Sequence, residues 1–139
     1  MVDKTLFLDF DGVLHPSIST DFFTKVDLLW SAIQDSPPHI VISSSWRFRH
    51  TLKQLKQLLG PDIGKCVIGT TGDAFIGRYA RNEEINQWIS LHRCTNWIIL
   101  DDSRFEFPEN SPRLLLCNAR TGLTDDIADK LKTWADSAG

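Results

Sequence analysis

Cysteine is scarce in this chain of 139 residues, and its three copies stand far apart. Cys66, Cys94 and Cys117 form no CxxC pair, and their odd number and wide spacing fit neither a disulfide framework nor a zinc site. Each lies in or beside an apolar stretch, where a thiol behaves as a small buried hydrophobe. We therefore expect three free structural cysteines and a reducing, cytoplasmic location.

Long hydrophobic runs and an excess of positive charge are also missing. Apolar runs such as Trp97 to Leu100 are far shorter than the roughly 20 residues that a membrane helix needs, and we expect no membrane contact. An apolar strand follows the first few residues directly, so no secretory leader is expected. Lys and Arg total 15 against 18 Asp and Glu, which argues against a dedicated nucleic-acid binder but allows a local basic strip.

Short apolar segments alternate with longer amphipathic ones along the whole chain. The pattern predicts strands at about 6–8, 39–42, 65–68, 96–100 and 113–117. It predicts helices at about 21–34, 46–59 (closed by Gly60-Pro61), 81–92 and from 124 onwards. The strands are solidly apolar rather than alternating, which is typical of a parallel sheet covered on both faces. With no repeat and no linker, the sequence predicts one α/β domain over residues 1–139.

Polar groups follow three of these strands at their carboxyl ends. Asp9 and Asp11 follow the first strand, Ser43-Ser44-Ser45 the second, and Asp101 and Asp102 the fourth. Each group alone is more often a helix cap or a strand terminator. Ligands of open parallel sheets bind beyond the carboxyl ends of the strands. If the first and fourth strands are neighbours, four carboxylates meet in one crevice, where a hard divalent cation would offset their repulsion.

Other metal and phosphate motifs do not fit. In an EF-hand loop beginning at Asp9, the sixth position would be Leu14 instead of Gly and the twelfth Thr20 instead of Glu. A Gly-rich dinucleotide loop and a P-loop lysine motif are both missing from the sequence.

The order and spacing of these polar groups resemble the motifs of the haloacid dehalogenase (HAD) superfamily of phosphotransferases. Asp9-Phe10-Asp11-Gly12-Val13 is similar to its first motif, DxDGV, Ser43 to its second, a Ser or Thr, and Asp101-Asp102 to its fourth, an acidic pair. The resemblance implies a three-layer Rossmann-like sandwich. Its five-stranded parallel sheet would have the order 5-4-1-2-3, with helices on both faces.

A narrower resemblance points to the small HAD domain of RNA-repair-type proteins. It rests on Ser43-Ser44-Ser45-Trp46-Arg47, on the helix start at Arg81-Asn82-Glu83-Glu84-Ile85 and on Gly122-Leu123-Thr124. The spans between the motifs leave no room for the cap domain that closes larger HAD enzymes. An open site suits a phosphate presented by something large, or a lid supplied by a partner subunit.

The resemblance implies Mg²⁺-dependent phosphoryl transfer through an aspartyl-phosphate. Asp9 is the expected nucleophile, and Asp11 the acid that protonates the leaving oxygen and then activates water. The expected Mg²⁺ ligands are Asp9, the backbone carbonyl of Asp11, and Asp101. Asp102 is expected beside them or orienting a bound water.

The phosphate itself is expected to contact a serine and a basic residue. Ser43 is the first choice for the hydroxyl, and Ser44 the alternative. No lysine lies between Cys66 and Asp101, so an arginine must serve as the third motif, with Arg81 first and Arg78 second.

Two further residues are possible substrate contacts. His15 either touches the substrate or packs, and Arg47 could reach the phosphate or the substrate. Arg49, Lys53 and Lys56 share a helix face that is either a solvated stripe or a nucleic-acid track.

The expected partner is thus a phosphorylated substrate, with a polynucleotide phosphate end as the leading hypothesis. A small phosphomonoester, a phosphoprotein and a non-catalytic binding module are the alternatives. The oligomeric state is left open.

Overall fold

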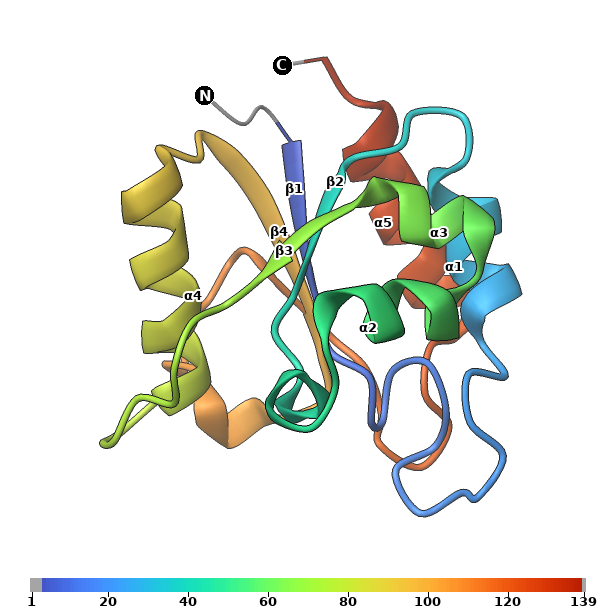
Figure 1. Cartoon of the computed structure of the whole chain (residues 1–139). Helices are drawn as coiled ribbons and strands as arrows, with labels where there is room; N and C mark the ends of the chain where they lie inside the picture. The colour runs from blue at the N-terminus through green and yellow to red at the C-terminus, as the bar shows by residue number, and fades with distance from the viewer. Residues whose placement is uncertain (1–3, 139) are drawn as a thin grey trace.

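The computed structural model describes residues 4–138, and its centre is a five-stranded parallel sheet (Figure 1). The strand order is β3-β2-β1-β4-β5, the order expected from the resemblance read from the other edge. The strands are β1 (Lys4–Leu8), β2 (His39–Ile42), β3 (Val67–Thr70), β4 (Asn96–Asp101) and β5 (Leu114–Leu116). All four strand pairs are parallel, which confirms the predicted α/β class.

Helices cover both faces of this sheet and make the fold a three-layer sandwich (Figure 1). Four helices lie on one face, and α4 (Ala80–His92) lies on the other. The four are α1 (Val26–Ile33), α2 (Leu52–Leu59), α3 (Pro61–Cys66) and α5 (Asp125–Asp136). No helix in residues 4–138 is long and apolar enough to cross a membrane.

Two hydrophobic cores fill the space between these layers. Alternate residues of β1 point to opposite faces, so Leu6 and Leu8 enter the larger core with α1, α2, α3 and α5. Phe7 enters the smaller core, where Trp88 of α4 packs edge-on against it at a centroid distance of 5.6 Å. Both faces of the central strand are thereby buried, which explains its solidly apolar sequence.

Boundaries were predicted wrongly for three elements, namely the first two helices and the third strand. The helix expected from residue 21 begins at Val26, because Phe23 adopts a positive φ of 61° that no helical residue has. The helix expected over 46–59 is divided into a 3₁₀ turn, η1 (Ser45–Phe48), and α2, which Thr51 starts with a capping box. Pro61 was expected to close a helix, but it is the first residue of α3. The third strand consequently begins at Val67, two residues later than expected.

The register of the sheet brings the predicted polar groups to one level. Leu8 pairs with Ile42 of β2 and with Leu100 of β4, so the residues that follow these three strands are neighbours. The backbone continues this pairing, since Asp9 N–H donates to Leu100 O and Ser43 N–H donates to Leu8 O.

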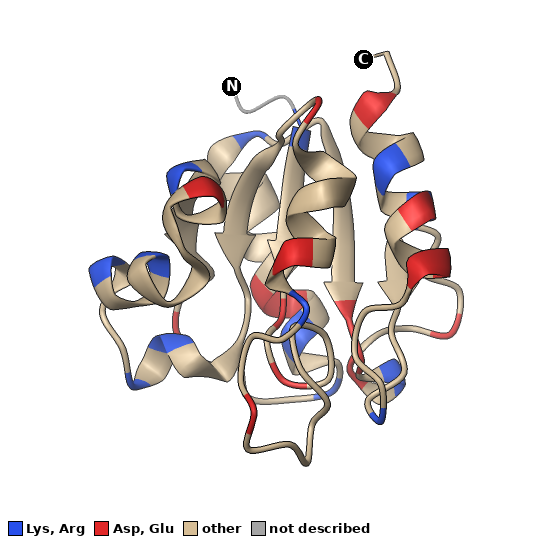
Figure 2. Cartoon of the chain, turned by 90° about the vertical axis from the view of Figure 1, so that its right-hand side faces the viewer, with Lys and Arg blue, Asp and Glu red and all other residues tan. Residues whose placement is uncertain are grey.

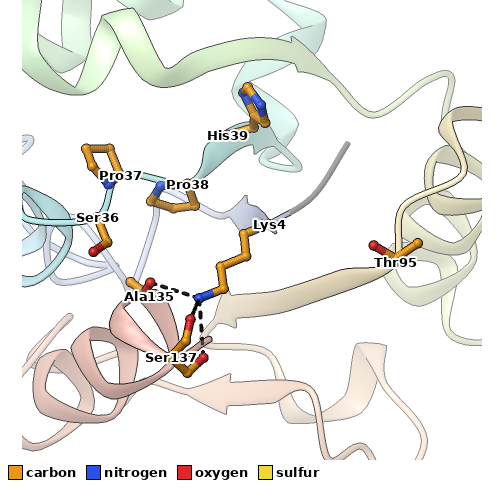
Figure 3. Close-up of a pocket in the computed structure, with 8 residues that line it drawn as sticks. All are labelled: Lys4, Ser36, Pro37, Pro38, His39, Thr95, Ala135 and Ser137. Carbon is orange, nitrogen blue, oxygen red and sulfur yellow. Dashed lines mark hydrogen bonds between the residues drawn. The ribbon is translucent and has the colours of Figure 1, made fainter. Parts of the chain in front are cut away.

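A separate pocket of about 600 Å³ lies at the opposite end of the sheet, beside the amino ends of the strands (Figure 3). Lys4, at the start of β1, directs its ammonium to the end of α5. It donates there to Trp134 O at 3.0 Å, to Ala135 O at 2.9 Å and to Ser137 O. A lysine at this position satisfies carbonyls that the helix end leaves free and complements its partial negative charge. Lys4 therefore connects the start of β1 to the end of α5.

Candidate active site

Three aspartates form a compact acidic cluster at the carboxyl ends of β1 and β4. One ligand oxygen from each of Asp9, Asp101 and Asp102 lies within 4.8 Å of the other two. Acidic segments just beyond the arrowheads of the strands are visible in Figure 2. Asp9 and Asp101 are buried, and Asp102 is half-buried.

Gly12 allows the turn after β1 to pack against this cluster. Its φ is +76°, and a Cβ at this position would lie 2.1 Å from Asp102 Oδ2. A side chain here would therefore displace Asp102 as well as strain the backbone.

One guanidinium lies against the acidic cluster. Arg81, in the first turn of α4, has Nη1 2.8 Å from Asp101 Oδ2 and 3.3 Å from Asp9 Oδ1. Burial lowers the pKa of the Arg81 guanidinium, but the carboxylates of Asp9 and Asp101 outweigh this and raise its pKa above the usual value. Arg81 therefore stays charged and sits where a phosphate bound beside Asp9 would meet it.

The cluster has more negative than positive charge. Burial, then the neighbouring Asp101 carboxylate, raises the pKa of Asp9 well above its usual range, and Arg81 only partly opposes this. The pKa of Asp101 is raised as well, chiefly by burial. Three carboxylates facing one guanidinium fit a further cation, and oxygen-only donors match the preference of Mg²⁺.

Asp11 lies beside this cluster, and two ring nitrogens hold its carboxylate. His15 Nε2 is 2.8 Å from Asp11 Oδ1, and Trp46 Nε1–H donates to Oδ2 at 3.1 Å. Phe23 N–H donates to His15 Nδ1 at 3.1 Å, so Nε2 carries the hydrogen and donates to Asp11. The Asp11 side chain remains 46% exposed, whereas His15 is fully buried. The carboxylate is thus fixed in orientation yet open to a ligand.

Two buried hydroxyls at the same end of the sheet have no hydrogen-bond partner among the described residues, Ser43 Oγ and Thr71 Oγ1. Ser44, by contrast, uses its hydroxyl to accept from Trp46 N–H and so begins η1. Buried hydroxyls without partners are uncommon because they lose free energy, and a phosphate oxygen would satisfy them. Of the two sequence-predicted serines, the structure leaves the hydroxyl of Ser43 available.

Arg47 and Arg78 are not brought into contact with the acidic cluster. Arg47 donates to Glu84 Oε1, to Gly72 O and to the carbonyls of Ser43 and Ser44. Its side chain is 3% exposed, and burial lowers its pKa despite the opposing effect of Glu84. Arg47 therefore connects the segments that follow β2 and β3 to helix α4.

Arg78 lies outside the cluster as well. Its guanidinium stacks on the ring of Tyr79 and lines a pocket of about 540 Å³ under residues 104–111. Of the two arginines considered for the third motif, only Arg81 contacts the acids.

Sequence reasoning missed three residues of this region. Thr71 directly follows β3, and Asp9, Ser43 and Asp101 hold comparable positions at the ends of their strands. Thr71 was missed because the predicted third strand ended at residue 68. Trp46 and Glu84 belong to the segments that carry the narrower resemblance, but no local signal indicated their roles, because their partners Asp11 and Arg47 lie 35 and 37 residues away along the chain.

Comparison with known proteins identifies one family. The model of one family, described as the HAD domain in Swiss Army Knife RNA repair proteins, matches residues 5–128. The matched range contains β2 to β5, all of β1 except its first residue, and the positions of the site residues described above. No curated protein and no solved structure gave a match.

Proposed function

The chain belongs to the family of HAD domains in Swiss Army Knife RNA repair proteins, and on this premise we propose that it is a Mg²⁺-dependent phosphatase of polynucleotide ends. The family supports phosphatase-type chemistry in an RNA-repair context. The observation that carries the proposal is the buried carboxylate of Asp9, which lies within 4.8 Å of the acidic pair and 3.3 Å from the charged Arg81, at the end of the sheet where the hydroxyl of Ser43 is free among residues 4–138.

Asp9 is the proposed nucleophile. Its carboxylate oxygen attacks phosphorus, the bond from phosphorus to the leaving oxygen breaks, and an aspartyl-phosphate forms. Arg81 and Ser43 hold the phosphate oxygens, whose charge they match by ion pairing and hydrogen bonding. Thr71 is a further candidate for this contact because its hydroxyl is also free.

Asp11 is the proposed acid and base. In the first step its carboxyl proton passes to the leaving oxygen. In the second step it takes a proton from water, which attacks phosphorus, releases inorganic phosphate and restores the Asp9 carboxylate. His15 and Trp46 each occupy one lone pair of an Asp11 oxygen, so both oxygens keep a lone pair for the proton. We therefore propose His15 as a positioning residue rather than a substrate contact.

Asp9, Asp101 and Asp102, with the backbone carbonyl of Asp11, would hold the Mg²⁺. When bound, the ion neutralises the carboxylates and the phosphate and so allows two anions to approach each other.

The test is phosphate release from para-nitrophenyl phosphate and from 3′- and 5′-phosphorylated RNA oligonucleotides, with Mg²⁺ or with EDTA. We expect release that needs Mg²⁺, is far faster on an oligonucleotide, and is lost in Asp9→Asn. Asp129→Asn is the matched control, because this exposed carboxylate of α5 lies outside the site. Release by pure Asp9→Asn at the wild-type rate would refute the mechanism. Release from the aryl phosphate alone would retain the chemistry and reject the polynucleotide end.

A further inference from the structure

A pocket lined largely by aromatic rings lies next to the proposed acid and base. It has a volume of about 560 Å³, in the range of small-molecule sites. Its lining residues are Phe22, Phe23, Trp46, Arg49, His50 and Leu58. They come from the loop before α1, from η1 and the two residues after it, and from α2.

Trp46 joins this pocket to the catalytic carboxylate. Its indole N–H donates to Asp11 Oδ2, and its ring lines the pocket. A general acid must reach the oxygen that leaves, so the group attached to that oxygen lies on the Asp11 side of the phosphate. The pocket is therefore placed to receive the leaving group.

The pocket offers aromatic surface on a rigid support. The Trp46 ring is stacked on His50 at a centroid distance of 5.3 Å, and Phe22 meets Trp46 edge-on at 5.4 Å. Phe22 is nevertheless 53% exposed, so much of its ring is free for another group. Phe23, beneath it, is fixed by its left-handed backbone and by its bond to His15. Rings held in this way favour a flat, aromatic ligand.

The surroundings of the pocket are basic, in contrast to the chain as a whole. Residues 48–60 contain three Lys or Arg and no Asp or Glu, in a chain of net charge −3. Arg49 lines the pocket, whereas Lys53 and Lys56 of α2 line a separate pocket between α2 and α3. None of these three makes an ion pair with any residue in the described range 4–138. Basic segments are visible on the short helices at the left of Figure 2.

We propose that this pocket binds the base of the terminal nucleotide, with Arg49 contacting a phosphate of the adjoining strand. The proposal rests on the proposed function, since it places the nucleoside of the leaving group. Stacking on aromatic rings combined with a basic surface is the usual way to hold a single strand without reading its sequence. A phosphoserine or phosphothreonine side chain, or a small aliphatic phosphoester, would leave these rings without a matching partner.

The first test compares two oligonucleotides that differ only in the terminal base. Both carry the same terminal phosphate, and in one the last nucleotide is abasic. We expect wild-type kcat/KM to favour the complete oligonucleotide by about 10-fold, equivalent to about 1.4 kcal/mol. Phe22→Ala is expected to abolish most of this preference. Phe105→Ala is the matched control, because this 88% exposed ring does not line the pocket. Equal kcat/KM of the wild type on both oligonucleotides would overturn the proposal.

A second test measures binding without catalysis. The indole N–H signal of Trp46 is followed by NMR while an unphosphorylated oligonucleotide is added, and Trp46→Phe identifies that signal. We expect a shift that is absent with the oligonucleotide whose terminal nucleotides are abasic and absent in Phe22→Ala.

The two tests separate the two proposals. A Trp46 shift without phosphate release from any oligonucleotide would support the base-binding pocket and reject the phosphatase function. Phosphate release without base preference and without a Trp46 shift would support the phosphatase and reject the pocket. Preferential hydrolysis of a phosphopeptide would overturn the assignment of the base as occupant.

Discussion

Arg47 lends itself to a quantitative test, because its four hydrogen bonds connect parts of the chain that are distant in sequence. It donates to Ser43 O and Ser44 O after β2, to Gly72 O after β3, and to Glu84 Oε1 in α4. Glu84 is only 6% exposed, and its other oxygen accepts from Phe75 N–H. Arg47→Met fills a similar length without donors and leaves a buried carboxylate without its counter-charge.

Removing one partner of such a buried pair typically lowers stability by about 3–5 kcal/mol. For a domain of this size that corresponds to a fall in Tm of roughly 10–15 °C. Adding Glu84→Gln to Arg47→Met removes the uncompensated charge, and we expect it to recover about 1–2 kcal/mol. Glu84→Gln alone should cost less than Arg47→Met, because the amide oxygen still accepts a hydrogen bond.

The assay is urea denaturation of the wild type, both single variants and the double variant. Arg120→Met, an exposed arginine, is the control and should change stability by less than about 0.5 kcal/mol. A loss below about 1 kcal/mol in Arg47→Met would refute the reasoning, as would additive effects in the double variant. A KM that rises by several powers of ten at unchanged stability would instead return Arg47 to the role of substrate contact that the sequence suggested.

Three further predictions concern the site itself. Ser43→Ala is expected to keep or raise Tm, because it removes a hydroxyl without a partner. It should raise KM for the phosphorylated oligonucleotide about 10-fold through the lost charge-assisted hydrogen bond, and steady-state kinetics with a melting curve would check both effects. Gly12→Ala should weaken Mg²⁺ binding at least about 10-fold in calorimetry, because its Cβ displaces Asp102. Unchanged affinity would contradict this close packing. Asp9→Asn in EDTA should be more stable than the wild type near neutral pH, because the raised pKa of Asp9 marks a charge that the fold disfavours. This advantage should shrink as pH falls, since protonation removes the same charge from the wild type, and melting curves across pH would show it.

The fold was predictable because its signals are local. A strand buried on both faces must be apolar throughout, so β1, β2 and β4 were recognisable by composition alone. The boundaries of elements of six residues or fewer were harder to predict. Helix α3 is too short to show a period, and it took Lys65 and Cys66 from the predicted third strand. Because the predicted third strand ended two residues too early, Thr71 was not recognised as the polar residue that directly follows this strand.

The sequence also could not decide which of two arginines contacts the acidic cluster. Arg78 and Arg81 are three residues apart in sequence and equally basic. Tyr79 takes a left-handed backbone with φ 55°, α4 begins at Ala80, and only Arg81 is carried toward the acids. The residue at which α4 begins therefore decided which of the two arginines contacts Asp9.

By itself the sequence determined which residue types end the central strands, and therefore that carboxylates and serines gather at one edge of the sheet. This follows because parallel strands must present their carboxyl ends together. Only the tertiary structure decided which polar atoms remain free there. Ser43 and Ser44 are adjacent and chemically identical, yet Ser44 caps η1 whereas the Ser43 hydroxyl has no hydrogen-bond partner among residues 4–138. Such differences depend on contacts across tens of residues, such as Trp46 with Asp11 and Arg47 with Glu84, which the folded chain alone brings within hydrogen-bond distance.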